Sequence, residues 1–267
     1  MHIRASLPLA LTCAILLSAC QAGRPSTETF NWKGPVKADA WLRLRNTSGD
    51  FSVREGTGDS AQITLNIERS SGYAPTAQVK VLATSDGVLA CVLFGDSNTC
   101  TEGEYKGGNP WTKHFLPFMR GETKVSGSIV LPKGVKLDVE SVNGDVSVGA
   151  AARDLVIRTV NGDINVKESF GPLDLHTTNG DIDAGVREVS GKVQVATTNG
   201  DVSLSLPTTL NAALNMHTVN GELELGFTGN FTRNTKKSIV ATLGLGGAPI
   251  DIETTNGDVS VTPFAAR

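Results

Sequence analysis

One pattern of apolar and polar positions recurs along the second half of the chain. Two apolar residues alternate with polar ones, a Ser or Thr follows, then Asn-Gly with an acidic residue, and then two more alternating apolar residues. A period of two on both sides of a turn predicts a strand, a turn and a second strand whose apolar side chains share one interior. Six copies keep this register, and their turns are Asn143-Gly144-Asp145, Asn161-Gly162-Asp163, Asn179-Gly180-Asp181, Asn199-Gly200-Asp201, Asn220-Gly221-Glu222 and Asn256-Gly257-Asp258.

The spacing of these copies favours stacked coils over hairpins. The first five Asn residues are 18 to 21 residues apart, and a gap of 36 residues precedes the last. Such a period is typical of solenoids, in which each coil is too small to fold alone and buries its apolar face against its neighbours. Asn-Gly is also a strong hairpin signal, so a two-residue hairpin is the alternative.

We therefore predict an all-β fold, a single-stranded β-helix (β-solenoid) of stacked 18–21-residue coils with Asn-Gly-Asp turns. We expect positive φ at these turns, because Gly adopts it freely and Asn tolerates it better than most residues. The doubled last gap predicts a decayed coil between Leu225 and Ile250. Residues 136–262 form the regular repeats, and residues 30–135 form an irregular opening of the same stack, in which Ser48-Gly49-Asp50 is an early copy of the turn.

The first residues have the features of an export signal. Residues 1–19 hold Arg4 and an apolar stretch, too short for an ordinary membrane span. They end in Leu-Ser-Ala before Cys20, which resembles the lipobox of bacterial lipoproteins, where the Cys carries the lipid and begins the mature chain. Gln21 then implies sorting to the outer membrane, with the periplasmic or surface side left open. Polar residues 20–29 predict a short tether.

Charge and cysteine content narrow the possible partners. Loss of residues 1–19 removes one cation and moves the net charge from -3 to -4, which does not favour nucleic-acid binding. In an oxidising compartment, Cys91 and Cys100 are the only thiols left once Cys13 is cleaved off and Cys20 is lipidated. We therefore expect a disulfide between them.

The following residues 107–121 hold Trp111, with further aromatic residues at 114, 115 and 118, and predict a cap or a recognition loop.

The polar columns offer candidate chemistry with simpler alternatives. The acidic residues after each Gly would repel one another and could share Ca²⁺, or they could accept amide hydrogen bonds at the turns. His176 and His217 occupy one outward column with Ala196 between them, too far apart to share zinc. Glu140, Arg158 and His176 predict a surface charge ladder. We predict no metal and no cofactor, and the chain has no nucleophile elbow or phosphate loop.

The lipobox, the Cys pair before a loop and the serial Asn-Gly-Asp turns together resemble the bacterial putative adhesin family, a β-solenoid family of unknown molecular function. The resemblance covers about residues 40 to 262 and brings no catalytic residues with it. It implies association with the cell envelope or surface. We therefore predict a lipid-anchored envelope scaffold or adhesin-like binding protein that is not an enzyme, with envelope proteins or glycans as partners. The alternative is a carbohydrate-binding or carbohydrate-active β-helix protein, resembling polysaccharide lyases or hydrolases.

Overall fold

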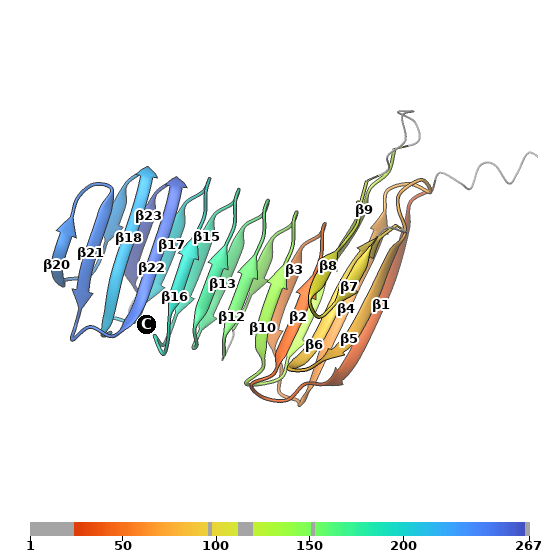
Figure 1. The fold of residues 1–267 in the computed structure, drawn as a ribbon, viewed down its shortest axis with the longest axis horizontal. Helices are drawn as coiled ribbons and strands as arrows, with labels where there is room; N and C mark the ends of the chain where they lie inside the picture. Colours follow the sequence, from red (N-terminus) through yellow and green to blue (C-terminus); the bar gives the residue numbers. More distant parts are fainter. Residues whose placement is uncertain (1–23, 96–97, 112–119, 151–152, 265–267) are drawn as a thin grey trace, which may run out of the picture.

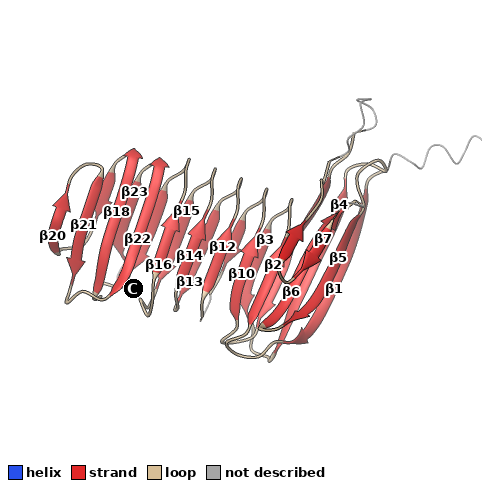
Figure 2. Ribbon diagram, viewed as in Figure 1, coloured by secondary structure: helices blue, strands red, loops and turns tan. Residues whose placement is uncertain are grey.

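The computed structural model describes residues 24–95, 98–111, 120–150 and 153–264. Two β-sheets lie face to face along one long axis, and their strands run across that axis (Figure 1). The described residues contain strands and loops but no helix (Figure 2). The predicted all-β class is therefore confirmed. The apolar columns of the repeat fill the space between the sheets, so the core is one continuous cluster from Val36 to Val261.

The first sheet has ten strands. Along the axis they are β1 (Ser26–Pro35), β4 (Ser60–Arg69), β9 (Thr123–Leu131), β3 (Phe51–Glu55), β11 (Val146–Val148), β13 (Ile164–Ser169), β15 (Ile182–Val186), β17 (Val202–Leu206), β23 (Val259–Pro263) and β19 (Leu223–Leu225).

The second sheet has eleven strands. In the opposite direction along the axis they are β20 (Asn230–Asn234), β21 (Ser238–Leu243), β18 (Ala212–Asn220), β22 (Ala248–Asn256), β16 (Val193–Ala196), β14 (Leu173–His176), β12 (Leu155–Arg158), β10 (Lys136–Glu140), β2 (Trp41–Arg45), β6 (Gly87–Phe94) and β5 (Ala77–Thr84). A separate hairpin is formed by β7 (Thr99–Thr101) and β8 (Glu104–Lys106).

Each repeat supplies one strand to each sheet. The strand before an Asn-Gly turn lies in the second sheet and the strand after it in the first, as β10 and β11 do around Asn143. Equivalent strands pair in parallel and in register, with Leu137 opposite Leu155 and Leu155 opposite Leu173. The two strands that flank a turn do not pair with each other, so the hairpin alternative is wrong.

The order of the coils along the stack differs from their order in the chain. The last coil, β22 and β23, lies between the coil of β16 and β17 and the coil of β18 and β19. Asn256 accordingly bridges Asn199 on one side and pairs with Asn220 on the other. The last strand of the chain, β23, therefore lies part-way along the stack and not at its end (Figure 1).

The predicted decayed coil between Leu225 and Ile250 is wrong. Those residues hold β20 and β21, which pair antiparallel with each other and close the end of the second sheet. β21 also pairs antiparallel with β18. The gap of 36 residues is long because the chain builds this end first and then returns to insert its last coil. The stretch 136–262 is therefore interrupted by a non-repeating hairpin.

The other end of the stack contains the early part of the chain. β2 and β3 pair in parallel with β10 and β11, and Ser48 bridges Asn143, so residues 41–55 make a coil of the same kind as those that follow. β1 pairs antiparallel with β4, with Ser26 opposite Arg69 and Pro35 opposite Ser60. Residues 26–29, which the polar composition assigns to the tether, thus belong to a strand.

Three side-chain ladders join successive turns. The Asn179 amide nitrogen donates to the Asn161 side-chain oxygen at 2.8 Å, and this bond recurs between neighbouring Asn residues of the stack. The hydroxyl of Thr177 donates to the carbonyl of Gly162 at 3.0 Å. The backbone N–H of Asp181 donates to the Asp163 carboxylate at 2.8 Å. Each turn is therefore hydrogen-bonded to the turn below it through side chains as well as backbone.

The Gly residues are needed for contact between coils as well as for their dihedral angles, since φ is positive, as expected, at Gly144, Gly180, Gly200 and Gly257. A Cβ built on Gly162, Gly180 or Gly257 would lie closer than 3.0 Å to the backbone carbonyl of the neighbouring turn's Gly, a separation that real Cβ atoms essentially never show. Among the described non-Gly residues only Asp39 has positive φ, so the expectation of positive φ at Asn is wrong. The turns require Gly because there is no room between two stacked backbones for any side chain.

Replacing Gly162 with Ala tests this explanation, because its φ lies outside the left-handed range and only the crowding remains. We expect Gly162→Ala to lower the free energy of unfolding by about 1–3 kcal/mol, the usual cost of overpacking. Gly58→Ala is the control, since a Cβ there meets nothing within 4 Å. Thermal or denaturant unfolding of the two variants measures the difference, and equal stability of both would contradict the explanation.

Candidate functional site

The outer face of the second sheet holds the largest charged network near the first coil. Leu42 and Leu44 point into the core, so the alternate residues Trp41, Arg43 and Arg45 of β2 point outward. Arg43 makes a bidentate pair with Asp86, both oxygens lying 2.7 Å from its guanidinium nitrogens. Arg45 lies 2.7 Å from Asp138, which also attracts Arg43.

Hydrogen bonding and charge lock the Arg43–Asp86 pair. The hydrogen bonds from Arg43 lower the pKa of Asp86 from 3.8 to about 2, against a smaller opposing effect of desolvation. Because the folded pKa is depressed, the pair is intact above about pH 4 and is lost as the pH falls toward 2. Arg43 therefore keeps its position over the whole neutral range.

The small hairpin of β7 and β8 covers part of the same face. Leu89, Cys91 and Leu93 of β6 point away from the main core and are nevertheless buried, because Cys100 and Tyr105 of the hairpin pack on them. Cys91 and Cys100 are joined by a disulfide, as predicted. The Tyr105 hydroxyl donates to the carbonyl of Val92 at 2.7 Å. The hairpin is thus fixed to β6 by a covalent bond, apolar contact and a hydrogen bond.

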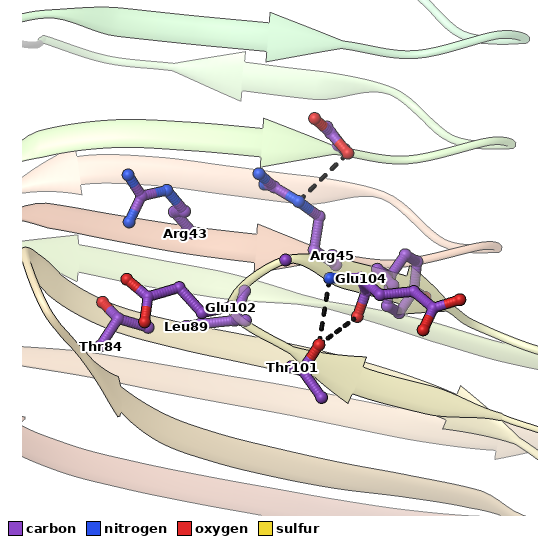
Figure 3. Close-up of a pocket in the computed structure, with 10 residues that line it drawn as sticks. Arg43, Arg45, Thr84, Leu89, Thr101, Glu102 and Glu104 are labelled. Carbon is purple, nitrogen blue, oxygen red and sulfur yellow. Dashed lines mark hydrogen bonds and ion pairs between the residues drawn. The ribbon is translucent and has the colours of Figure 1, made fainter.

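A first hollow of about 290 Å³ lies between this hairpin and the arginines. Figure 3 shows Arg43 and Arg45 on one side and Glu102 and Glu104 from the hairpin on the other. Its carboxylates are already partnered: Glu140 lies 3.1 Å from Arg45, Glu104 lies 2.6 Å from Lys106, and Glu102 accepts the backbone N–H of Ser85. The hollow is therefore a polar recess whose charges are mostly satisfied within the protein.

A second hollow of about 190 Å³ lies further along the same face, beyond β10. Trp41 forms one wall, Val156 and Pro172 supply apolar surface, and polar side chains complete the lining, among them Asp174, Lys192 and Gln194. The guanidinium of Arg43 lies 5.3 Å from the centre of the Trp41 ring, and Lys136 Nζ lies 5.6 Å from it. This recess combines an aromatic wall with hydrogen-bonding groups.

The acidic residues of the turns act as backbone acceptors. The Asp145 carboxylate accepts the N–H of Asp163 at 2.9 Å, and the same bond links the other acidic residues up to Glu222. In the described part of the chain no group of three or more His, Cys, Asp or Glu side chains could hold a metal ion. The column therefore has the hydrogen-bonding role that was the alternative to Ca²⁺.

The predicted His and charge columns lie on the outer face of the second sheet. Asp174 pairs with both Arg158 and His176, the latter at 2.8 Å. Glu140 pairs with Arg45 instead of Arg158. Between His176 and His217 lie Ala196 and Glu253, so the two imidazoles are three coils apart, not the two expected from the sequence. The inserted last coil explains the extra step.

Some predicted residues lie outside the part that can be described. Cys20 and residues 112–119 of the aromatic loop are among them. Trp111 is described, and 44% of its surface is exposed. No helix of the described residues is long and apolar enough to span a bilayer.

The two hollows were not predicted from the sequence. The signal that could have indicated them is local: Trp41, Arg43 and Arg45 are three large side chains at the outward positions of one strand, where the later repeats carry smaller residues such as Gln194 and Ala196. The partners from residues 84–86 and 99–106 are separated from β2 by too many residues for the pattern to reveal them.

The fold and this outer face define a β-solenoid-like protein with a recessed surface that carries hydrogen-bonding groups. Among the described residues, the repeated acidic side chains form no metal site. The Toastrack DUF4097 family model matches residues 35–262, and the chain belongs to that family. The resemblance identified from the repeated turns is thereby confirmed.

Comparison with solved structures finds matches to proteins from several bacteria. A putative cell adhesion protein from Clostridium sporogenes ATCC 15579 has 10% identity and a TM-score of 0.48, covering 88% of this chain and 100% of its own. A putative adhesin from Bacteroides fragilis NCTC 9343 has 13% identity and a TM-score of 0.40, covering 90% and 99%. A putative adhesin from Parabacteroides merdae ATCC 43184 has 12% identity and a TM-score of 0.29, covering 91% and 97%. No curated protein matches the chain significantly.

Titration of Tyr105 tests how firmly the hairpin is docked. Burial raises the pKa of its phenol from 10.0 to about 12, so this contribution to stability is present below pH 10 and is lost as the pH rises toward 12. The chain has two Tyr, so Tyr73→Phe leaves Tyr105 as the only phenol. Phenolate absorbance after rapid pH jumps should give a midpoint near 12 in the oxidised protein and a lower one after reduction. A midpoint near 10 in the oxidised protein would show that the hairpin is not packed on β6.

Proposed function

We propose that the protein is a lipid-anchored scaffold or adhesin-like binding module of the cell envelope, without catalytic activity of its own. The observation that carries the proposal is the outer face of the second sheet, where two hollows lie on a rigid ladder of paired strands. A recess fixed by a disulfide-linked hairpin and by ion pairs can bind a ligand with little loss of conformational entropy.

The chemistry of this face favours binding over hydrolysis. A glycoside hydrolase needs one uncharged carboxylic acid and one carboxylate facing each other across the scissile bond. In the first hollow, Glu140 and Glu104 are held in ion pairs with Arg45 and Lys106. Carboxylates that are used in this way support the structure of the recess, so the polysaccharide lyase or hydrolase alternative is less well supported than binding.

The position of β1 supports a membrane-proximal arrangement. If Cys20 carries a lipid, residues 21–25 separate it from the start of β1 at Ser26. Five residues span at most about 18 Å when fully extended. The end of the stack that contains β1 and β5 would then stay close to the membrane surface. The other end, which contains β19 and β20, would lie farther from the anchor along the long axis.

The anchor is tested by two variants of the full chain in a bacterial host with two membranes. Cys20→Ala removes the thiol that would receive the lipid, and we expect an unprocessed chain whose intact mass includes residues 1–19 and no lipid. Gln21→Asp keeps the thiol, and we expect lipidation with a shift from the outer to the inner membrane. Membrane fractionation and the intact mass report both results. Normal processing and membrane association of Cys20→Ala would contradict the proposal.

Binding and catalysis are separated with the purified mature protein and isolated envelope material. We expect the protein to be retained on the envelope preparation while the mass profile of its soluble glycans stays unchanged over time. Ser203→Glu, on the outer face of the first sheet, should bind like the parent. Release of new glycan fragments that grows with protein concentration would instead establish an enzyme.

A further inference from the structure

We propose that the second hollow, beside Trp41, is a binding site for one uncharged sugar ring of an envelope glycan. This inference rests on the proposed binding function and assigns its ligand class. The site is formed by residues of four strands and their preceding loops. Trp41 from β2 is the wall, and Val156, Asp174 and Gln194 come from the adjacent strands β12, β14 and β16 on the far side of β10.

Trp41 has the properties of a fixed stacking platform. Its indole lies near two cations, Arg43 and Lys136. Each cation is itself held, Arg43 by both carboxylate oxygens of Asp86 and Lys136 by Asp154 at 3.1 Å. A ring that is already immobilised loses little freedom when a ligand stacks on it. The C–H face of a pyranose is apolar and matches such an aromatic surface.

The rest of the lining suits the hydroxyl groups around a sugar ring. Lys192 Nζ donates to Gln194 Oε1 at 2.7 Å, so the Gln194 amide can offer its N–H groups to a ligand. Asp174 supplies a carboxylate as an acceptor at the same recess. Val156 and Pro172 complete an apolar floor between these polar groups. An apolar wall and floor with donors and acceptors beside them match a molecule that has both C–H faces and hydroxyl edges.

Charge and size exclude other classes of ligand. Asp154 is paired with Lys136, and Asp174 is paired with Arg158 and His176, so both carboxylates of the lining have cationic partners. A cationic ligand would therefore find no unpaired carboxylate in the lining. An anionic ligand could approach Lys192, whose ammonium donates to Gln194, but the lining also holds the carboxylates of Asp154 and Asp174, which repel it. Burial of either kind of charge in the recess is costly. Drug-sized ligands occupy cavities of about 300–1,000 Å³. At about 190 Å³ the hollow accommodates a single ring, with the neighbouring rings of a glycan outside it.

The test uses the full mature protein and a panel of uncharged glycans, namely mannan, β-glucan, galactan and oligomers of N-acetylglucosamine, with an acidic polysaccharide for comparison. We expect at least one uncharged glycan to bind. Trp41→Ala should weaken its affinity at least tenfold, whereas Trp41→Phe should retain part of it. Val156→Arg, which fills the recess from a partly exposed position, should abolish binding. Trp111→Ala is the matched control, because Trp111 is exposed and does not line this hollow.

Unfolding curves of the Trp41 and Val156 variants should match that of the parent, so that a loss of binding reports on the site. If the glycan binds all variants equally, the site assignment is wrong although the binding function stands. If no uncharged glycan binds while the envelope preparation still retains the protein, the sugar class is wrong. If the parent binds neither the envelope preparation nor any glycan, the proposed function itself fails.

Discussion

The structure depends on the close contact between successive Asn-Gly-Asp turns. At this corner the two backbones approach so closely that a Cβ on Gly180 would overlap the carbonyl of Gly162. The approach brings Asn side chains within 2.8 Å of one another and lets each acidic side chain accept the next turn's N–H. Because these bonds run from coil to coil, a turn can satisfy them only through its neighbours. The stability of one coil is therefore tied to that of the coils on either side.

The same register determines where function can reside. Once the apolar columns face inward, every other residue faces out and forms rows along the sheets, with adjacent strands about 4.8 Å apart. β2 presents three large outward side chains together, Trp41, Arg43 and Arg45, and the two arginines are held by Asp86 and Asp138. The hairpin of β7 and β8, bonded to β6 through Cys100, adds a wall beside them. The recesses thus occur where the irregular part of the chain meets the regular stack.

The repeat made much of the fold predictable. Alternating apolar residues such as Leu137 and Val139 indicated the core, and the period indicated the stacking of coils, including the early copy at Ser48. The order of the coils could not be predicted, because the turns at Asn220 and Asn256 share the Thr, Asn and Gly of the ladders, and either Asn fits against Asn199. They differ only in the acidic residue, Glu222 against Asp258, and both carboxylates suit a turn that accepts an N–H. The order of the coils depends on whether residues 226–247 fold as a coil or as a hairpin at the end of the sheet.

The candidate site was less predictable for a related reason. The pairing of Arg43 with Asp86, and of Cys100 with the outer face of β6, joins segments whose proximity follows from the loops and not from the repeat. The disulfide itself was predictable from export chemistry, since few thiols remain. The hairpin's contact with Leu89 and Leu93 was not, because outward positions of a strand are ordinarily solvated.

Cysteine cross-linking tests the stack and its coil order most directly. Ser203 lies opposite Ser260, and Ser260 lies opposite Glu224, on the outer face of the first sheet. Neighbouring strands bring Cα atoms within disulfide range, whereas two strand spacings, about 9–10 Å, do not. The pair Ser203→Cys with Ser260→Cys should therefore oxidise to an intramolecular disulfide, and the pair Ser203→Cys with Glu224→Cys should stay reduced. Cross-linking of the second pair but not the first would show that the coils stack in chain order and would contradict the inserted last coil.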